Sequence, residues 1–282
     1  MTLELEYIGN TTIPLELQGV TPCRLRELSL PEIEQIEVYH GKEIVPLAEF
    51  FKISGDPADE QMCFSGDLTG VHWIGWKMES GSITIAENCG RHLGSEMKAG
   101  TILVQGNASD WVGAEMRGGL IHIKGNAGHQ VGAGYRGSST GMNRGTILVH
   151  GDVGNELGLT MRRGLIAVAG KAGDLIGFNM RAGTIILFGE AGIRHGAAMR
   201  RGSIVFMGAD PPPLLPSFKY SCRYQPEFMQ LLLRNLEALG FPVPNIADGA
   251  TYDLHHGDMI DCLLYTSPSP RDQRGSRMPS SA

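Results

Sequence analysis

Basic side chains recur at one position of a repeating pattern, and their spacing suits binding chemistry. Each follows a methionine by one or two residues: Lys98, Arg117, Arg144, Arg162, Arg163, Arg181, Arg200 and Arg201. They gather on two neighbouring columns of a chain whose formal net charge is −6. Because a guanidinium pairs carboxylates bidentately, such a row would fit a repeated anion on a partner or ligand. The alternative is a row of solvated arginines beside Glu96, Glu115 and Glu156.

Other chemistry finds little support in the sequence. It contains no HExxH, P-loop or nucleophile-elbow motif, and its five cysteines form no CxxC pair. We therefore predict no catalytic, cofactor-binding or metal-binding residue in this chain. His255 and His256 form either a metal pair or part of a polar loop. His195 replaces an apolar residue of the pattern, as either a functional imidazole or a side chain turned outward by a distorted last coil.

The elements that would position the basic columns are seven repeats of the form G-x-x-M-x-x-G-[STL]-I. The first glycines are Gly75, Gly94, Gly113, Gly132, Gly158, Gly177 and Gly196. Successive units are 19 residues apart except for one step of 26. We expect that step to hold a seven-residue insertion, Tyr135–Gly141, which bulges without disturbing the neighbouring repeats.

A 19-residue unit is too short for a βαβ crossover and lacks the two strands of a hairpin. The pattern favours an all-β fold, a right-handed parallel β-helix: a single-stranded solenoid of about seven 19-residue Gly/Met coils, with a short C-terminal α-helix. Two inward ladders are expected. One is Ile83, Ile102, Ile121, Ile147, Ile166, Ile185 and Ile204; the other is Met78, Met97, Met116, Met142, Met161, Met180 and Met199.

The flanks suggest four segments. Residues 1–60 would lead into and cap the repeats, 61–210 form the repeat domain, 211–254 hold a Pro-rich segment and a helix, and 255–282 form a disordered or non-native tail. Helical periodicity, a leading proline and Gly240 place the helix at Pro226–Leu239. Outward strand positions turn apolar late, at Ile186, Phe188, Val205 and Met207. We expect the chain's own helix to cover them, with another subunit as the alternative.

Composition narrows the setting. The N-terminal residues lack the basic and apolar regions of a signal peptide, and no stretch approaches the ~20 apolar residues of a membrane helix. The acidic balance argues against nucleic acid as a partner. We expect a cytoplasmic protein.

The glycine-methionine coils, from GVHWIGWKM to GAAMRRGSIVFMG, and the following PPPLLPSFKY resemble the C subunit of formylmethanofuran dehydrogenase. They also resemble its bacterial counterpart in the formyltransferase/hydrolase complex of tetrahydromethanopterin-linked one-carbon metabolism. The resemblance covers roughly residues 40–245. A related pattern forms the C-terminal β-helix of the large glutamate synthase subunit, but this chain lacks that enzyme's amidotransferase and flavin domains.

The resemblance implies a non-catalytic scaffold subunit of a formyl-transferring complex. Its partners would be an amidohydrolase-like subunit, a formyltransferase and the B subunit. Zinc, molybdenum or tungsten pterin and iron–sulfur clusters would belong to those partners, and the carrier would be methanofuran or methylofuran with a glutamate-rich tail. Whether the complex works as a dehydrogenase or a hydrolase stays open. The alternatives are a glutamate-synthase-type domain relaying between active sites and a free-standing structural β-helix.

Overall fold

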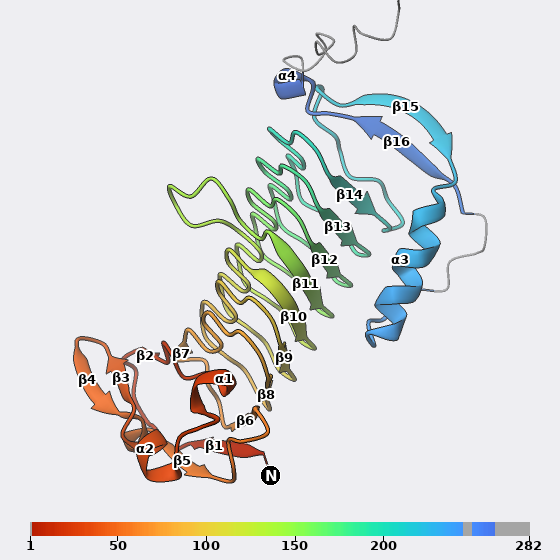
Figure 1. Cartoon of the computed structure of the whole chain (residues 1–282). Coiled ribbons are helices and arrows are strands. Elements are labelled where there is room, and N and C mark those ends of the chain that lie inside the picture. Colours follow the sequence, from red (N-terminus) through yellow and green to blue (C-terminus); the bar gives the residue numbers. More distant parts are fainter. Residues whose placement is uncertain (1, 245–249, 263–282) are drawn as a thin grey trace, which may run out of the picture.

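The computed structural model describes residues 2–244 and 250–262 (Figure 1). Ten of the described strands form one sheet, which runs along the molecule in a single row. In spatial order they are β14 (Ser203–Phe206), β13 (Thr184–Leu187), β12 (Leu165–Val168), β11 (Arg144–Val149), β10 (Arg117–Ile123), β9 (Thr101–Val104), β8 (Ser82–Ile85), β6 (Gln61–Ser65), β1 (Leu3–Tyr7) and β5 (Phe51–Ser54).

The repeats are in register, as predicted. Each contributes one strand, β8 to β14, and these strands with their turns form the repeat stack. Ile102 pairs with Ile83 and Ile121, and Ile166 pairs with Ile147 and Ile185, all in parallel. The predicted isoleucine ladder is confirmed. The methionine ladder is confirmed too, since its members are fully buried except Met199, which is 6% exposed.

The glycines and the two ladders fit one another across neighbouring repeats. A Cβ atom at Gly158 would lie 2.6 Å from Cδ1 of Ile185 in the next repeat. A Cβ at Gly183, whose φ is 105°, would lie 2.9 Å from the methyl carbon of Met161 in the preceding repeat. Only glycine allows both this backbone conformation and this approach. The glycine spacing therefore fixes where the isoleucine and methionine side chains enter the core.

The prediction of a right-handed parallel β-helix is wrong. The sheet is open and mixed: β1 pairs parallel with β6 but antiparallel with β5, and further antiparallel pairs lie at both ends. A closed solenoid would need more extended segments in every repeat. Between its single strand and the next, each repeat instead turns through residues with positive φ and meets its neighbours at one-residue bridges, such as Cys89 to Ala108. The fold is mostly β, with few helices.

The N-terminal region closes one end of the repeat stack (Figure 1). It holds β1 and β5, the helices α1 (Pro22–Leu25) and α2 (Leu30–Glu34) and the 3-10 turn η1 (Leu47–Glu49). A four-stranded sheet joins β4 (Glu43–Pro46), β3 (Glu37–His40), β2 (Leu15–Glu16) and β7 (Val71–His72). Leu3, Leu5 and Phe51 are buried in the same core as the repeats.

The C-terminal region lies against the other end and the outer face of the sheet (Figure 1). It comprises β15 (Lys219–Tyr224), α3 (Glu227–Ala238), β16 (Tyr252–His256) and α4 (Met259–Cys262). Met229, Leu233 and Leu236 of α3 form a second core with the outer face of β11–β13. The predicted apolar patch packs against this core, so its cover by the chain's own helix is confirmed: Ile186, Phe188, Val205 and Met207.

The predicted tail, 255–282, begins inside β16, and residues 263–282 lie outside the described residues. Strands β15 and β16 pair with each other in a separate antiparallel sheet. Within residues 2–244 and 250–262, no helix combines the length and apolar character needed to cross a membrane.

Candidate functional site

The stacked repeats align the first basic column. In six successive repeats, the backbone N–H after the methionine donates to the carbonyl of the methionine one repeat earlier, at 2.7–2.8 Å. The donors are Lys98, Arg117, Asn143, Arg162, Arg181 and Arg200. Arg144, Arg163 and Arg201 follow one position later, and every basic residue of the two columns is exposed. Because the strands are spaced by about 4.8 Å, the cations form a row along the molecule.

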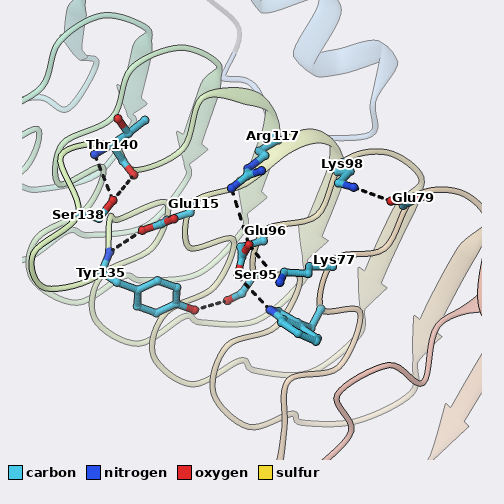
Figure 2. A network of polar contacts seen from close by, with 11 residues as sticks. Lys77, Glu79, Ser95, Glu96, Lys98, Glu115, Arg117, Tyr135, Ser138 and Thr140 are labelled. Carbon is cyan, nitrogen blue, oxygen red and sulfur yellow. Dashed lines mark hydrogen bonds and ion pairs between the residues drawn. The ribbon is translucent and has the colours of Figure 1, made fainter.

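Acidic side chains pair with the two cations nearest the N-terminal end of this row (Figure 2). Lys98 Nζ lies 2.5 Å from Glu79 Oε1, and this hydrogen bond and charge hold the pKa of Glu79 below its usual value. Arg117 Nη2 lies 3.7 Å from Glu96 Oε2. Of the three predicted acidic neighbours, Glu96 is therefore a partner of the column.

Further along the row, the balance of charge changes. Among the described residues, no ion pair joins Arg144, Arg162, Arg163 or Arg181 to a carboxylate. Arg200 and Arg201 each take part in an interaction. Within the described part of the chain, the row is thus partly neutralised at Lys98 and Arg117 and presents uncompensated charge across the middle repeats.

Glu96 ties neighbouring repeats together. Its carboxylate accepts a hydrogen bond from Trp76 Nε1 at 3.2 Å and lies 3.7 Å from Lys77 Nζ and from Arg117 Nη2. Lys77 Nζ also lies 4.1 Å from the centre of the Trp76 ring. These contacts join the basic columns to an aromatic surface on the same repeats (Figure 2).

That surface is a column of three rings, Trp73, His92 and Trp111, one from each of three consecutive repeats. The rings of Trp73 and His92 stack at 4.0 Å with 7° between planes, and those of His92 and Trp111 lie 6.0 Å apart. Tyr135, the first residue of the insertion, packs 5.1 Å from Trp111. We call these four residues the aromatic column.

Tyr135 anchors the insertion to this column. Its hydroxyl donates to Ser95 Oγ at 3.0 Å and accepts from His92 Nδ1 at 3.1 Å, while its backbone N–H donates to Glu115. Burial raises the pKa of Tyr135 to about 12 and lowers the pKa of His92 to about 4. Both side chains are therefore neutral at physiological pH.

The sequence analysis missed the aromatic column. The signal was present, because Trp73, His92 and Trp111 each stand two residues before the first glycine of a repeat. It was hidden because this position faces the surface and carries Gln130, Glu156, Leu175 and Arg194 in the later repeats. The insertion was placed correctly: Ile121 pairs with Ile147 across the 26-residue step, and the next pairing is undisturbed.

A second missed cluster lies on the outer face of the sheet near α3. Nε2 of His122 and Nε2 of His150 are 2.6 Å apart, and Lys124 Nζ lies 3.1 Å from the first and 3.4 Å from the second. Burial lowers the pKa of His122 to about 4, helped by the charge of Lys124, and lowers the pKa of His150 as well. The ring of Phe241 packs against His150.

The other histidines take structural places. His195 is only 2% exposed, and its Nε2 bonds to the Gly192 carbonyl at 2.8 Å, so the expectation that it turns outward is wrong. His255 and His256 lie on β16, opposite Tyr220 and Lys219 of β15. In the described part of the chain, no three His, Cys, Asp or Glu side chains gather as a metal-binding group.

Comparison with known proteins places this geometry among known relatives. No family model matches the chain. A segment is 40% identical over 87 residues to the C subunit of the tungsten-containing formylmethanofuran dehydrogenase 2 of Methanothermobacter wolfeii, which is 29% of this chain and 32% of that protein. The C subunit of the molybdenum-containing formylmethanofuran dehydrogenase 1 of Methanothermobacter thermautotrophicus is 42% identical over 83 residues, or 29% of this chain and 21% of that protein. The chain thus spans about a third or less of the length of these curated relatives.

The structural match is much longer. A chain in the crystal structure of the formyltransferase/hydrolase complex of Methylorubrum extorquens with methylofuran superposes with a TM-score of 0.84 at 30% identity. The match covers 91% of this chain and 95% of that chain. The chain therefore belongs to the family formed by the C subunits of formylmethanofuran dehydrogenase and of the formyltransferase/hydrolase complex.

Proposed function

We propose that this chain is the non-catalytic scaffold, or C subunit, of a cytoplasmic complex that transfers and hydrolyses formyl groups carried on methanofuran or methylofuran. The observation that carries this proposal is the match along nearly the whole chain to a component of a complex solved with methylofuran. The rigid register of the repeats supports it, because a stack of aligned strands offers long faces on which other subunits can be fixed relative to one another.

Affinity purification of the complex tests this function. The tagged chain, expressed with the neighbouring reading frames of its genome, is expected to bring down an amidohydrolase-like subunit, a formyltransferase and the B subunit. Zinc, and any molybdenum or tungsten pterin and iron–sulfur clusters, should remain with those partners after the chain is separated from them. Recovery of the chain alone, or with glutaminase and flavin subunits, would overturn the proposal.

Within this function, the basic columns bind an acidic face of a partner subunit. The support is the run of cations at Arg144, Arg162, Arg163 and Arg181, which no carboxylate of the described residues neutralises. An acidic partner face is favoured over the glutamyl tail of the carrier because the columns are an exposed row rather than a pocket. Each exposed ion pair contributes only ~0.2–1 kcal/mol, so the binding energy must come from the row as a whole.

Reversal of Arg144, Arg162 and Arg181 to Glu tests this role against a control that reverses Lys42, Lys219 and Arg234, three exposed cations outside the columns. Assembly and carrier affinity are measured from low to high salt. We expect the column variant alone to lose assembly, most clearly at low salt, where charges are least screened. Loss of carrier affinity with normal assembly would assign the columns to the carrier. No effect on either would show that they are solvated surface.

A further inference from the structure

Strand β14 ends the ten-stranded sheet with one edge unpaired. Its neighbour on one side is β13. On the other side, no described strand pairs with it, because β15 and β16 form a separate sheet. The N-terminal end of the stack is treated differently, since β6 pairs with β1 and β1 in turn with β5.

The backbone groups on this edge can be assigned from the ladder. The N–H of Ser203 donates to the carbonyl that directly precedes β13 at 3.0 Å, and the N–H of Met207 donates to the last carbonyl of β13 at 2.8 Å. Alternate residues of a strand direct their backbone groups to opposite sides, so those of Ile204 and Phe206 face away from β13. Among the described residues, neither N–H donates a backbone hydrogen bond outside the strand ladder.

A cavity of about 930 Å³ lies along this edge. The strand and the C-terminal hairpin both line it, with Phe218 and Leu214 contributing apolar surface. The side chains of Ile204 and Phe206 are only partly buried here, whereas Ile185 and Leu187, their equivalents one repeat earlier, are 0% exposed. The apolar core of the repeats is therefore open at this end.

The charge around the cavity is mainly positive. Its lining includes Arg200, Arg201, His255 and His256. Among the described residues of that lining there is one carboxylate, Asp253, which accepts two hydrogen bonds of 2.7 Å from Arg223. An extended segment with apolar side chains and an acidic flank would satisfy the edge, the core and the charge together.

We propose that this cavity receives an extended, acidic segment of a partner subunit, which adds to β14 as an eleventh strand. The segment would be about five residues long, the usual length of a strand. Its backbone pairs with Ile204 and Phe206, and its alternate side chains close the open end of the core. The partner is another component of the complex, so this inference rests on the proposed function.

Site-resolved hydrogen exchange on the isolated chain and on the assembled complex tests the added strand. The amides of Ile204 and Phe206 are expected to exchange freely in the isolated chain and at least 100-fold more slowly in the complex. The amides of Val205 and Met207 already bond to the preceding repeat and serve as internal controls. Slow exchange of Ile204 and Phe206 in the isolated chain would show that the chain itself fills the edge and would overturn the inference.

Ile204→Pro gives an independent check, because it removes an N–H that makes no bond within the sheet. Its melting temperature should stay within a few degrees of wild type, while Val205→Pro, which removes an N–H of the ladder, should lower it clearly. Ile204→Pro should weaken assembly at least tenfold. A complex that assembles normally with unprotected Ile204 and Phe206 overturns the added strand but leaves the proposed function standing, whereas failure of the wild-type chain to assemble overturns both.

Discussion

The side chain of Met161 lies wholly inside the repeat stack, and its methyl group packs beside Gly183 of the next repeat. An ionised carboxylate at this place would have neither water nor a cationic partner. Every repeat uses methionine here because an unbranched thioether can adapt to the narrow space beside the glycine backbone. The column fills the core and needs no metal to explain it.

Met161→Asp is expected to destabilise the fold by several kcal/mol, because it buries a charge without compensation. Met161→Leu keeps the volume and should cost less than ~1.5 kcal/mol. Urea denaturation of both variants provides the measurement. A Met161→Asp protein that unfolds at the same urea concentration as wild type would contradict the burial of this column.

His122 makes stability depend on pH. Its pKa in the folded chain is about 4, below the usual 6.5, because burial and the nearby Lys124 disfavour the imidazolium. The unfolded chain therefore binds the proton first as the pH falls, and the free energy of unfolding should decrease from about pH 6.5 down to about pH 4.

His122→Leu should reduce that acid-side loss, since leucine already occupies the paired positions 103 and 148. Thermal melts of variant and wild type between pH 4 and 7.5 give the difference attributable to this residue. Parallel pH profiles for the two proteins would rule out His122 as a contributor.

At the scale of single residues, the sequence predicts those places that the repeat dictates. The isoleucine and methionine ladders follow from spacing alone, because each side chain meets its own kind one repeat away. Tyr135 could not be placed on Trp111, since they come from different parts of two repeats and meet only through the path of the insertion. The contact of His122 with His150 was similarly hidden, because they occupy different strand positions.

Among the elements, the insertion is an ordered loop that rises beside β10 and β11 (Figure 1). Besides the Tyr135 contacts, the N–H of Ser138 donates to the Tyr135 carbonyl at 2.9 Å, and that of Gly141 donates to the Thr160 carbonyl at 3.0 Å. Arg136, Gly137 and Ser139 are exposed on it. A loop held at both ends in this way is suited to contact a partner without a large loss of conformational freedom.

Deleting Tyr135–Gly141 should leave the chain folded, because it restores the spacing of Gly132 and Met142 to that of the other repeats. Trp73 and Trp111 lose the cover of Tyr135, so tryptophan fluorescence should shift to longer wavelength. We also expect assembly of the complex to weaken. Tyr135→Phe, which keeps the ring but loses the hydrogen bond to Ser95, is the matched control. Unchanged assembly of the deletion would mark the loop as a tolerated insertion.

The elements also show where sequence reasoning fails. Helix α3 was predicted within one residue at each end, because a leading proline, amphipathic spacing and a terminal glycine all act locally. The predicted closed solenoid was wrong because the repeat specifies register but not how many of its residues stay extended. The antiparallel return of β5 beside β1 depends on contacts between distant segments, for which the sequence carries no periodic signal.

For the whole molecule, each repeat packs mainly on the two beside it, so the effect of a core substitution should depend on its place along the stack. Ile166 is fully buried between neighbouring repeats, whereas Ile204 borders the open end. Ile166→Ala should therefore cost about 2–5 kcal/mol, and Ile204→Ala clearly less. Denaturant titrations of the isolated chain compare the two, and equal costs would show that the last repeat is as tightly packed as the middle.

Trp73, His92 and Trp111 all have φ between 63° and 65°, a left-handed backbone conformation that bulky residues seldom adopt. A side chain with a Cβ loses ~1–2 kcal/mol there relative to the right-handed conformation, and glycine or asparagine tolerates it better. Laboratory evolution for heat resistance alone would thus tend to replace these aromatic residues with glycine or asparagine. The hardiest descendants would keep their fold while their aromatic surface was erased.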